Sequence, residues 1–542
     1  MSEVDVAPAE NRGAERSPWF ILAILCLGFF MILLDTTIVN IAVPEMTVTL
    51  GATLDQILWI VNAYTLTYAT LLITGGRLGD LLGQKRLFLA GLTIFTAASA
   101  LCGLAQTPGH LIATRVLLGV GGALLTPQTL AIITVTFPAK RRGTAFGIWG
   151  AVAGLATITG PMFGGWLVTA LSWRWIFYVN LPIGLATLAL GWLFLPDLRL
   201  NKRHRLDPVG TVLASGGLFL VCFGLIEGPS HAWGQVWGVI TIPVLIAAGV
   251  ALLAIFVLQQ RGHTEPLVPP KIFADRNFAV MSGVIAAISF GMLGLFLPLV
   301  IFLQSVLSLN AWQAGLILAP MSLASVASAP FAGRLADRYG GKDTLITGLI
   351  LWAGGVFLVL WATRLYYDKG ELITGLVIAG FGLGMTFAPL QSIAMHNVEP
   401  QVAGAAAGVM NTMRQLGAVL GSAAVGAVLQ VQIVNRLGSS ARQNVDALPQ
   451  SMRARFLEGF EKAATAKGLE VGAGQTGTHL PPDIPSSVRP AIEQVALKTF
   501  YEAYIPAMRA TLILPLVVLV LAVIGALLVR PRADDEEQST DS

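Results

Sequence analysis

Stretches of about twenty apolar residues with few charges recur along the whole chain, separated by shorter polar segments. A bilayer core of about 30 Å requires roughly 20 residues of α-helix, so each stretch is long enough to cross it. Fourteen stretches meet this condition, at residues 19–43, 57–76, 87–105, 110–133, 143–170, 175–195, 209–226, 237–258, 278–303, 313–333, 344–363, 372–395, 404–430 and 507–529. The pattern therefore predicts an all-α polytopic membrane protein with 14 transmembrane helices.

Positive charges are distributed unevenly between these stretches. The two chain ends and the alternate loops on their side hold twenty Lys and Arg residues, whereas the opposite short loops hold three, Arg174, Arg364 and Lys369. Because translocation of positive charge is disfavoured, both chain ends are predicted to be cytoplasmic. The long segment 431–506 then lies outside the cell. Its two amphipathic stretches, 452–467 and 487–504, are expected to form short helices on the external rim, with a structural role favoured over substrate gating.

Composition supports a membrane protein and excludes several other classes. Hydrophobic residues make up 55% of the 542 positions and charged residues only 12%, against about 25% charged in soluble domains. The net charge of +4 is too small and too dispersed for nucleic-acid binding. The three cysteines lie in apolar stretches and the six histidines are isolated, so neither a disulfide framework nor a metal site is expected. No phosphate-binding loop occurs, which leaves an ion gradient as the energy source and predicts no cofactor.

An internal repeat divides the chain into two halves. Residues 76–85 read GRLGDLLGQK and residues 333–342 read GRLADRYGGK, with six of ten positions identical at a separation of 257. A second pair is in register, because Gly143 and Gly147 correspond to Gly404 and Gly408. Parallel halves around a substrate path are a transporter architecture. The chain is therefore divided into a cytoplasmic tail 1–18, a six-helix half 19–197, two inserted helices with flanking loops 198–277, a six-helix half 278–530 that includes the external loop 431–506, and an acidic cytoplasmic tail 531–542.

The repeated loop contains both signs of charge. Asp80 and the cations Arg77, Lys85 and Arg86 can form a cluster that makes and breaks as the halves rock, while glycines permit tight turns and close helix approach. Topology alone would explain the cations, but neither the acid nor the repeated spacing. We therefore interpret the loop as a gate with the residues Gly76, Arg77, Asp80, Gly83, Lys85, Arg86 and, in the second copy, Asp337.

Two ionisable residues lie deep within predicted helices of the first half. A carboxylate inside a bilayer costs at least about 2.5 kcal/mol, so Asp35 is expected to face a cavity and to carry a proton. Arg115 keeps its charge and can bias the protonation of nearby carboxylates or bond helix backbones. A purely structural role stays open for both. The repeat places Met292 and Val377 at the corresponding positions of the second half, so proton handling is expected in the first half.

These motifs resemble those of the major facilitator superfamily, in its fourteen-helix drug:proton antiporter branch. The loop 76–85 is similar to the superfamily signature, residues 34–44 to the first-helix signature, and residues 111–123 to the fourth-helix motif with its intramembrane arginine. The run Gly160, Pro161, Met162, Phe163, Gly164, Gly165 is similar to the antiporter motif, although Ala156 stands where the family often has Gly. The resemblance implies proton-coupled export, with Gly160, Pro161, Gly164 and Gly165 restricting leak between the halves.

The expected substrate path is apolar with scattered polar groups. The candidate cavity residues are Asn40, Trp59, Asn62, Tyr64, Tyr68, Gln128, Gln304, Gln391, Asn411 and Arg414. The function predicted is export of amphipathic, cationic drugs or metabolites in exchange for protons by a monomer in the bacterial cytoplasmic membrane. Import by symport on the same fold stays an alternative, and a membrane enzyme or receptor is a weaker one, because no convergent catalytic cluster is present.

Overall fold

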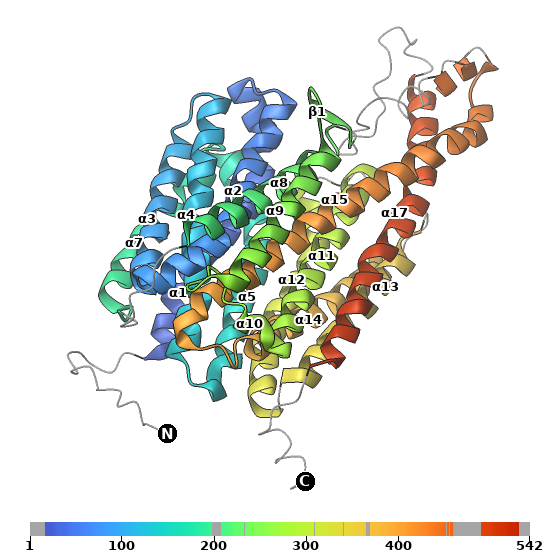
Figure 1. Ribbon diagram of the computed structural model, residues 1–542. Helices are drawn as coiled ribbons and strands as arrows, with labels where there is room; N and C mark the ends of the chain where they lie inside the picture. The colour runs from blue at the N-terminus through green and yellow to red at the C-terminus, as the bar shows by residue number, and fades with distance from the viewer. Residues whose placement is uncertain are drawn as a thin grey trace, which may run out of the picture.

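The computed structural model describes residues 17–529 except 198–206, 365–368, 459–488 and the single positions 232, 308, 310, 340, 451 and 455. Nearly all of this part of the chain is helical (Figure 1). The first half contains α1 (Pro18–Leu50), α2 (Leu54–Leu82), α3 (Gln84–Gly103), α4 (Pro108–Thr136), α5 (Ala139–Ala170), the single turn α6 (Trp175–Tyr178) and α7 (Asn180–Phe194).

The middle of the chain and the second half are also mainly helical. The middle contains α8 (Pro208–Glu227), the two short strands β1 (Gln235–Trp237) and β2 (Ile240–Thr241), which pair antiparallel, then α9 (Ile242–Gly262) and α10 (Lys271–Ala274). The second half contains α11 (Arg276–Ile301), a π-turn (Phe302–Val306), α12 (Ala311–Tyr339), α13 (Gly341–Ala362), α14 (Lys369–Ala394), a 3₁₀ turn (Pro400–Val402), α15 (Ala403–Asn444), a 3₁₀ turn (Val445–Ala447) and α17 (Arg489–Leu527).

Local sequence explains where several helices begin. Thr53 and Gln56 form a reciprocal capping box at the start of α2, with backbone-to-side-chain bonds of 3.3 and 3.0 Å. Thr107 caps α4 and is followed by proline at the first helical position. Asp275 accepts bonds from the first backbone N–H groups of α11. These caps satisfy donors that would otherwise be unpaired at the helix starts.

Thirteen helices of the described chain are long and apolar enough to cross a membrane. Helix α5 is not among the thirteen, although its 32 residues give a length of about 48 Å. The predicted stretches are largely helical, although the stretch 237–258 begins in β1 and β2 and becomes helical only at Ile242. The polytopic all-α architecture is confirmed. The total of fourteen spans stays a prediction.

The two halves lie side by side and contact each other mainly through α2 and α5 of the first half. In Figure 1 the blue and cyan helices of the first half lie beside the yellow to red helices of the second, with the green α8 and α9 in front. Helix α5 packs along α12 and α14, and α2 packs along α15. We call the end of the bundle at which α1 begins and α17 ends the tail end. The crossed packing places segments from both halves around a common centre.

The inserted helices form a tight hairpin against this bundle. Gly217 of α8 and Gly249 of α9 face each other so closely that a Cβ on either would meet the partner helix. At its tail end, the buried Asp207 accepts bonds from Gly210 N and Gln260 Nε2, of 2.8 and 2.7 Å. Burial raises the pKa of Asp207, but these hydrogen bonds outweigh it and leave the pKa of that carboxyl below its ordinary value.

The segment that follows α15 differs from its sequence-based description. Helix α15 continues to Asn444, well past the predicted span end at residue 430, and the stretch 487–504 is largely the first part of the continuous α17 rather than a separate short helix. The two extensions project beyond the bundle (Figure 1) and share a small core that includes Ala441, Phe456 and Ile492. Residues 459–488, which include most of the first amphipathic stretch, lie outside the described chain.

Candidate functional site

A buried ion pair joins α1 to α4 in the first half. Asp35 Oδ2 contacts Arg115 Nη1, and the two side chains are 0% and 1% exposed. Arg115 Nε also donates a 3.0 Å bond to the backbone oxygen of Ile60, and its guanidinium lies 4.5 Å from the centre of the Tyr64 ring. The two costly charges therefore compensate each other. A change in the protonation of Asp35 would directly alter the electrostatic interactions of Arg115 and Tyr64.

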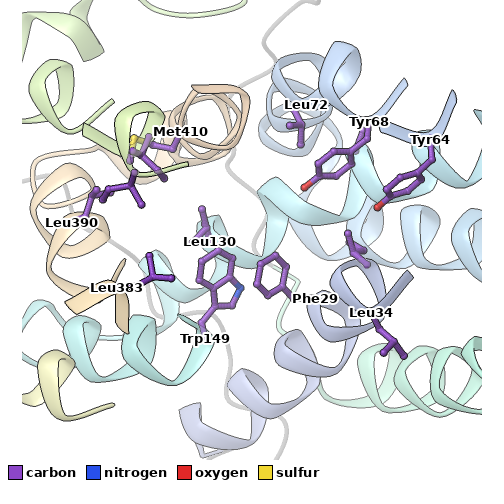
Figure 2. Close-up of a cluster of buried hydrophobic side chains, with 14 of the residues drawn as sticks. Phe29, Leu34, Tyr64, Tyr68, Leu72, Leu130, Trp149, Leu383, Leu390 and Met410 are labelled. Atoms are coloured by element: carbon purple, nitrogen blue, oxygen red, sulfur yellow. The ribbon is translucent and has the colours of Figure 1, made fainter. Parts of the chain in front are cut away.

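A chain of contacts leads from this pair to the second half. The rings of Tyr64 and Tyr68 are stacked with centroids 5.7 Å apart, and both side chains come from α2 (Figure 2). The Tyr68 hydroxyl donates to Thr126 over 3.2 Å and accepts from Arg414 Nη2 of α15 over 3.2 Å. A change at the ion pair thus has a continuous packed route to a cation of the other half.

At the tail end, two carboxylates cross between the halves. Asp80, at the end of α2, accepts from the backbone N–H groups of Gly404 and Ala405 in the first turn of α15, both at 2.8 Å. Its counterpart in the repeat, Asp337, accepts from the N–H groups of Gly143 and Thr144 near the start of α5, both at 2.8 Å, and from the Thr144 hydroxyl at 2.6 Å. Each half therefore anchors a helix start of the other, where the helix dipole favours negative charge.

The remaining loop residues surround these contacts. Gly76 lies directly against Gly404, where a Cβ would meet the backbone. Arg77 is buried and interacts with the Asp80 charge, and Gly83 ends α2 at a φ of +97°, which favours glycine. Lys85 donates to the backbone oxygens of Trp192 and Leu195 at the end of α7, whereas the Arg86 side chain is exposed. The predicted single cluster is thus distributed over separate contacts.

The glycines of the predicted antiporter motif lie on α5 beside α1. A Cβ on Gly160 would meet the Thr37 side chain, and one on Gly164 would lie 2.5 Å from Ile38 Cγ1, whereas Gly165 faces open space. The side chain of Pro161 is outside the described part of the structure. Thr37 and Ile38 follow Asp35 by less than one helical turn. The motif therefore allows α5 to approach α1 next to the buried ion pair.

A central cavity lies between the halves, lined by residues of both. Its volume is about 90 Å³, the space of a few water molecules. Phe29 stacks on Trp149 at one wall, with ring centroids 4.1 Å apart, and Leu383 lies nearby (Figure 2). Other lining residues include Met292, Phe296, Phe387, Ser322, Ser325 and Arg414. In this closed arrangement the space admits a small group, and a larger cargo requires the halves to separate.

Of the ten predicted cavity residues, Arg414 lines this cavity. Several others have different contacts: Gln128 donates to Gly75 O, Asn411 to Ala407 O and Asn40 to Thr36 O, while Trp59 packs near Phe223 of α8. The described side chains of Asn62 and Gln304 are half-buried, and Gln391 is buried. The sequence did not predict the aromatic and methionine residues of the cavity wall. An apolar side chain in a span can face lipid, the core or a cavity, and its hydropathy does not distinguish these. Only the repeat pointed to one of the wall residues, by pairing Met292 with Asp35.

The chain belongs to the Major Facilitator Superfamily, whose family profile matches residues 25–422. An uncharacterized MFS-type transporter of Mycobacterium tuberculosis is 40% identical over 80% of this chain and 73% of the relative. The tetracenomycin C resistance and export protein of Streptomyces glaucescens is 34% identical over 88% of this chain and 86% of the relative. The solved human organic anion transporter MFSD10 shares the fold, with a TM-score of 0.55 at 14% identity, covering 93% of this chain and all of that one.

These findings establish the class of protein. The chain is a multi-pass membrane transporter and not an enzyme, which confirms the family resemblance seen in the motifs. Export of drugs or antibiotics is supported at the level of the class by its relatives.

Proposed function

We propose that the protein is a proton-coupled antiporter that exports amphipathic drugs or metabolites across the cytoplasmic membrane and works as a monomer. The observation that carries the proposal is the fully buried Asp35–Arg115 pair, because an intramembrane acid beside a fixed cation is a group whose charge a proton can switch. The export relative supports the direction of transport. The superfamily membership supports alternating access.

The positive-charge asymmetry supports placing the tail end in the cytoplasm. With this orientation, the crossed contacts of Asp80 and Asp337 close the cytoplasmic side, and the structure represents the state closed to the cytoplasm. Opening requires both anchors to release their helix starts. The loop copies then act as a two-part latch on the rocking of the halves.

Proton exchange requires that the proton and the cargo favour different states, since a ligand bound equally in both shifts nothing. Protonation of Asp35 removes the charge that compensates Arg115, which changes the contacts of Arg115 with Tyr64 and, through Tyr68, those of Arg414. The sequence alone favours a cationic cargo attracted by Asp35. In this state, however, Asp35 is paired with Arg115 and is not among the residues that line the cavity.

The test uses the purified protein in vesicles of defined orientation with an imposed pH gradient. Tetracenomycin C and a panel of aromatic drugs are followed across the membrane, while an enclosed dye reports protons. Export against proton entry, lost in Asp35→Asn, is the expected result. Movement of drug and protons in the same direction would instead favour the importer, and drug flux without proton movement would reject the coupling.

A further inference from the structure

The central cavity has a charge as well as an apolar wall. Among the described residues that line it, Arg414 carries the only formal charge. The rest of the wall is mostly aromatic and aliphatic, with two serine side chains, Ser322 and Ser325, as neutral polar groups. The cavity therefore presents a cation to whatever enters it.

This cation is incompletely satisfied by the protein. Arg414 Nη2 donates to Tyr68 Oη over 3.2 Å and to Asn411 Oδ1 over a long 3.5 Å, and Nε is buried without a hydrogen-bond partner. Among the described salt bridges none involves Arg414. Arg414 is partly buried, and its guanidinium offers five donors in a fork that matches a carboxylate. The geometry leaves donor capacity for a ligand.

The acid that could attract a cationic cargo does not face the cavity. Asp35 is fully buried and its charge is compensated by Arg115. The charges of Asp35, Arg115 and Arg414 sum to one positive charge when Asp35 is ionised and to two when it is protonated. In both protonation states the centre of the protein is electrostatically favourable for an anion and unfavourable for a cation.

We propose that the cavity selects aromatic amphipathic anions, such as carboxylates, sulfonates or phenolates. Once the halves separate far enough to admit the ring system, the anionic group binds the Arg414 guanidinium in place of its bond to Tyr68. The ring system then lies against the Phe29–Trp149 stack (Figure 2) and the Phe296 and Phe387 side chains. The inference rests on the proposed function in one respect, that this cavity is where cargo binds. It reverses the sign of charge that the sequence alone suggests.

The test compares two probes that share a pyrene ring on a short alkyl chain and differ in the charged end group, 1-pyrenebutanoate and 1-pyrenebutyltrimethylammonium. Equilibrium dialysis measures their binding to the protein in zwitterionic nanodiscs, with empty nanodiscs subtracted. We expect the parent to bind the carboxylate at least about tenfold more tightly, the effect of one charge-assisted hydrogen bond. Arg414→Gln should lose this preference, whereas Arg414→Lys and Tyr68→Phe, which keep the cation, should retain it.

Tighter binding of the ammonium probe by the parent, an unchanged preference in Arg414→Gln, or no binding of either probe would overturn the proposal. If Arg414→Gln does not fold, Ser322→Asp adds a negative charge to the wall and should abolish or reverse the preference. The binding measurement needs no proton gradient, so it tests the anion site independently of the proposed proton-coupled transport. Selective binding of the carboxylate without proton-driven flux rejects the antiporter alone, and proton-driven flux of cations only rejects the anion site alone.

Transport gives a second measurement that needs no variant. Export of a monoanion against one entering proton moves two charges in the same sense, whereas export of a monocation against one proton moves none. Proteoliposomes with a potassium diffusion potential and no pH gradient allow this measurement. Export of 1-pyrenebutanoate should accelerate when the compartment that corresponds to the cytoplasm is made negative. Export rates that ignore the potential would contradict an anionic cargo.

Discussion

The Asp80 anchor gives a quantitative test of the latch. In Asp80→Asn one oxygen still accepts an N–H bond, but the other acceptor becomes an NH₂ group facing a backbone donor at the start of α15. The loss of one hydrogen bond to a charged group and of the charge–dipole attraction amounts to roughly 2–4 kcal/mol. The equilibrium between the states closed and open at the tail end should therefore shift toward open by about 30- to 700-fold.

Asp337→Asn should have a smaller effect. Asp337 is less buried than Asp80, and one of its three donors is the hydroxyl of Thr144, which can rotate to accept from an amide instead. The amide still leaves one backbone N–H without its charged acceptor, so the loss in Asp337→Asn lies at the lower end of the range for Asp80, about 2 kcal/mol. The two variants form an internal comparison, because they alter corresponding positions of the repeat.

Spin labels at Lys140 and Glu399, exposed residues of opposite halves near the tail end, report the opening as a change in distance distribution. Asp80→Asn should populate longer distances and slow turnover, because the closing step is weakened. The matched control is Asp343→Asn, an exposed acid near the same end. A parental distance distribution together with parental turnover in Asp80→Asn would refute the latch and leave topology as the only role of this loop.

Three further predictions concern the ion pair, the orientation and the α1–α5 contact. Asp35→Asn should abolish pH-gradient-driven export and lower the stability by about 3–5 kcal/mol in denaturant unfolding, since Arg115 stays buried without its counter-charge; adding Arg115→Gln should restore stability without export, and normal export in either would place coupling elsewhere. A cysteine at Lys140 should react with impermeant maleimide only from the cytoplasm, with little background because the native cysteines are buried; labelling of intact cells would invert the topology. Gly164→Val should impair export by separating α5 from α1, while Gly165→Ala, which faces open space, should not; equal transport by both would remove the packing argument.

The internal repeat predicts the elements of the site but not the contacts between them. In the sequence, the two copies of the loop form one repeated pair, and Gly143 with Gly404 forms another. In the structure the two pairs are in contact, because Asp80 accepts a bond from Gly404 N and Asp337 accepts one from Gly143 N. Sequence periodicity identifies the elements and their direction, but contacts over 194 and 324 positions depend on how the halves pack.

Polar residues inside the bilayer were harder to assign. Gln128 and Asn411 were expected in the cavity, but their amides donate to backbone oxygens within the helical bundle. Buried amides need partners whether or not a substrate is near, so their presence in a span does not distinguish packing from binding. The length of α15 was missed for a related reason, because hydropathy reports where a chain meets lipid and not where a helix ends.

Helices α2 and α15 are held together at two points that are a fixed distance apart. The first is the bond of Asp80 to Gly404, and the second is the bond of Arg414 to Tyr68. The points are 12 residues apart on α2 and 10 on α15, or about 18 and 15 Å along rigid helices. Separation of the halves at the tail end must therefore strain or break the Tyr68 bond as well. An anion that takes Arg414 away from Tyr68 removes one of these two attachments, so cargo binding and opening of the latch are coupled through the same pair of helices.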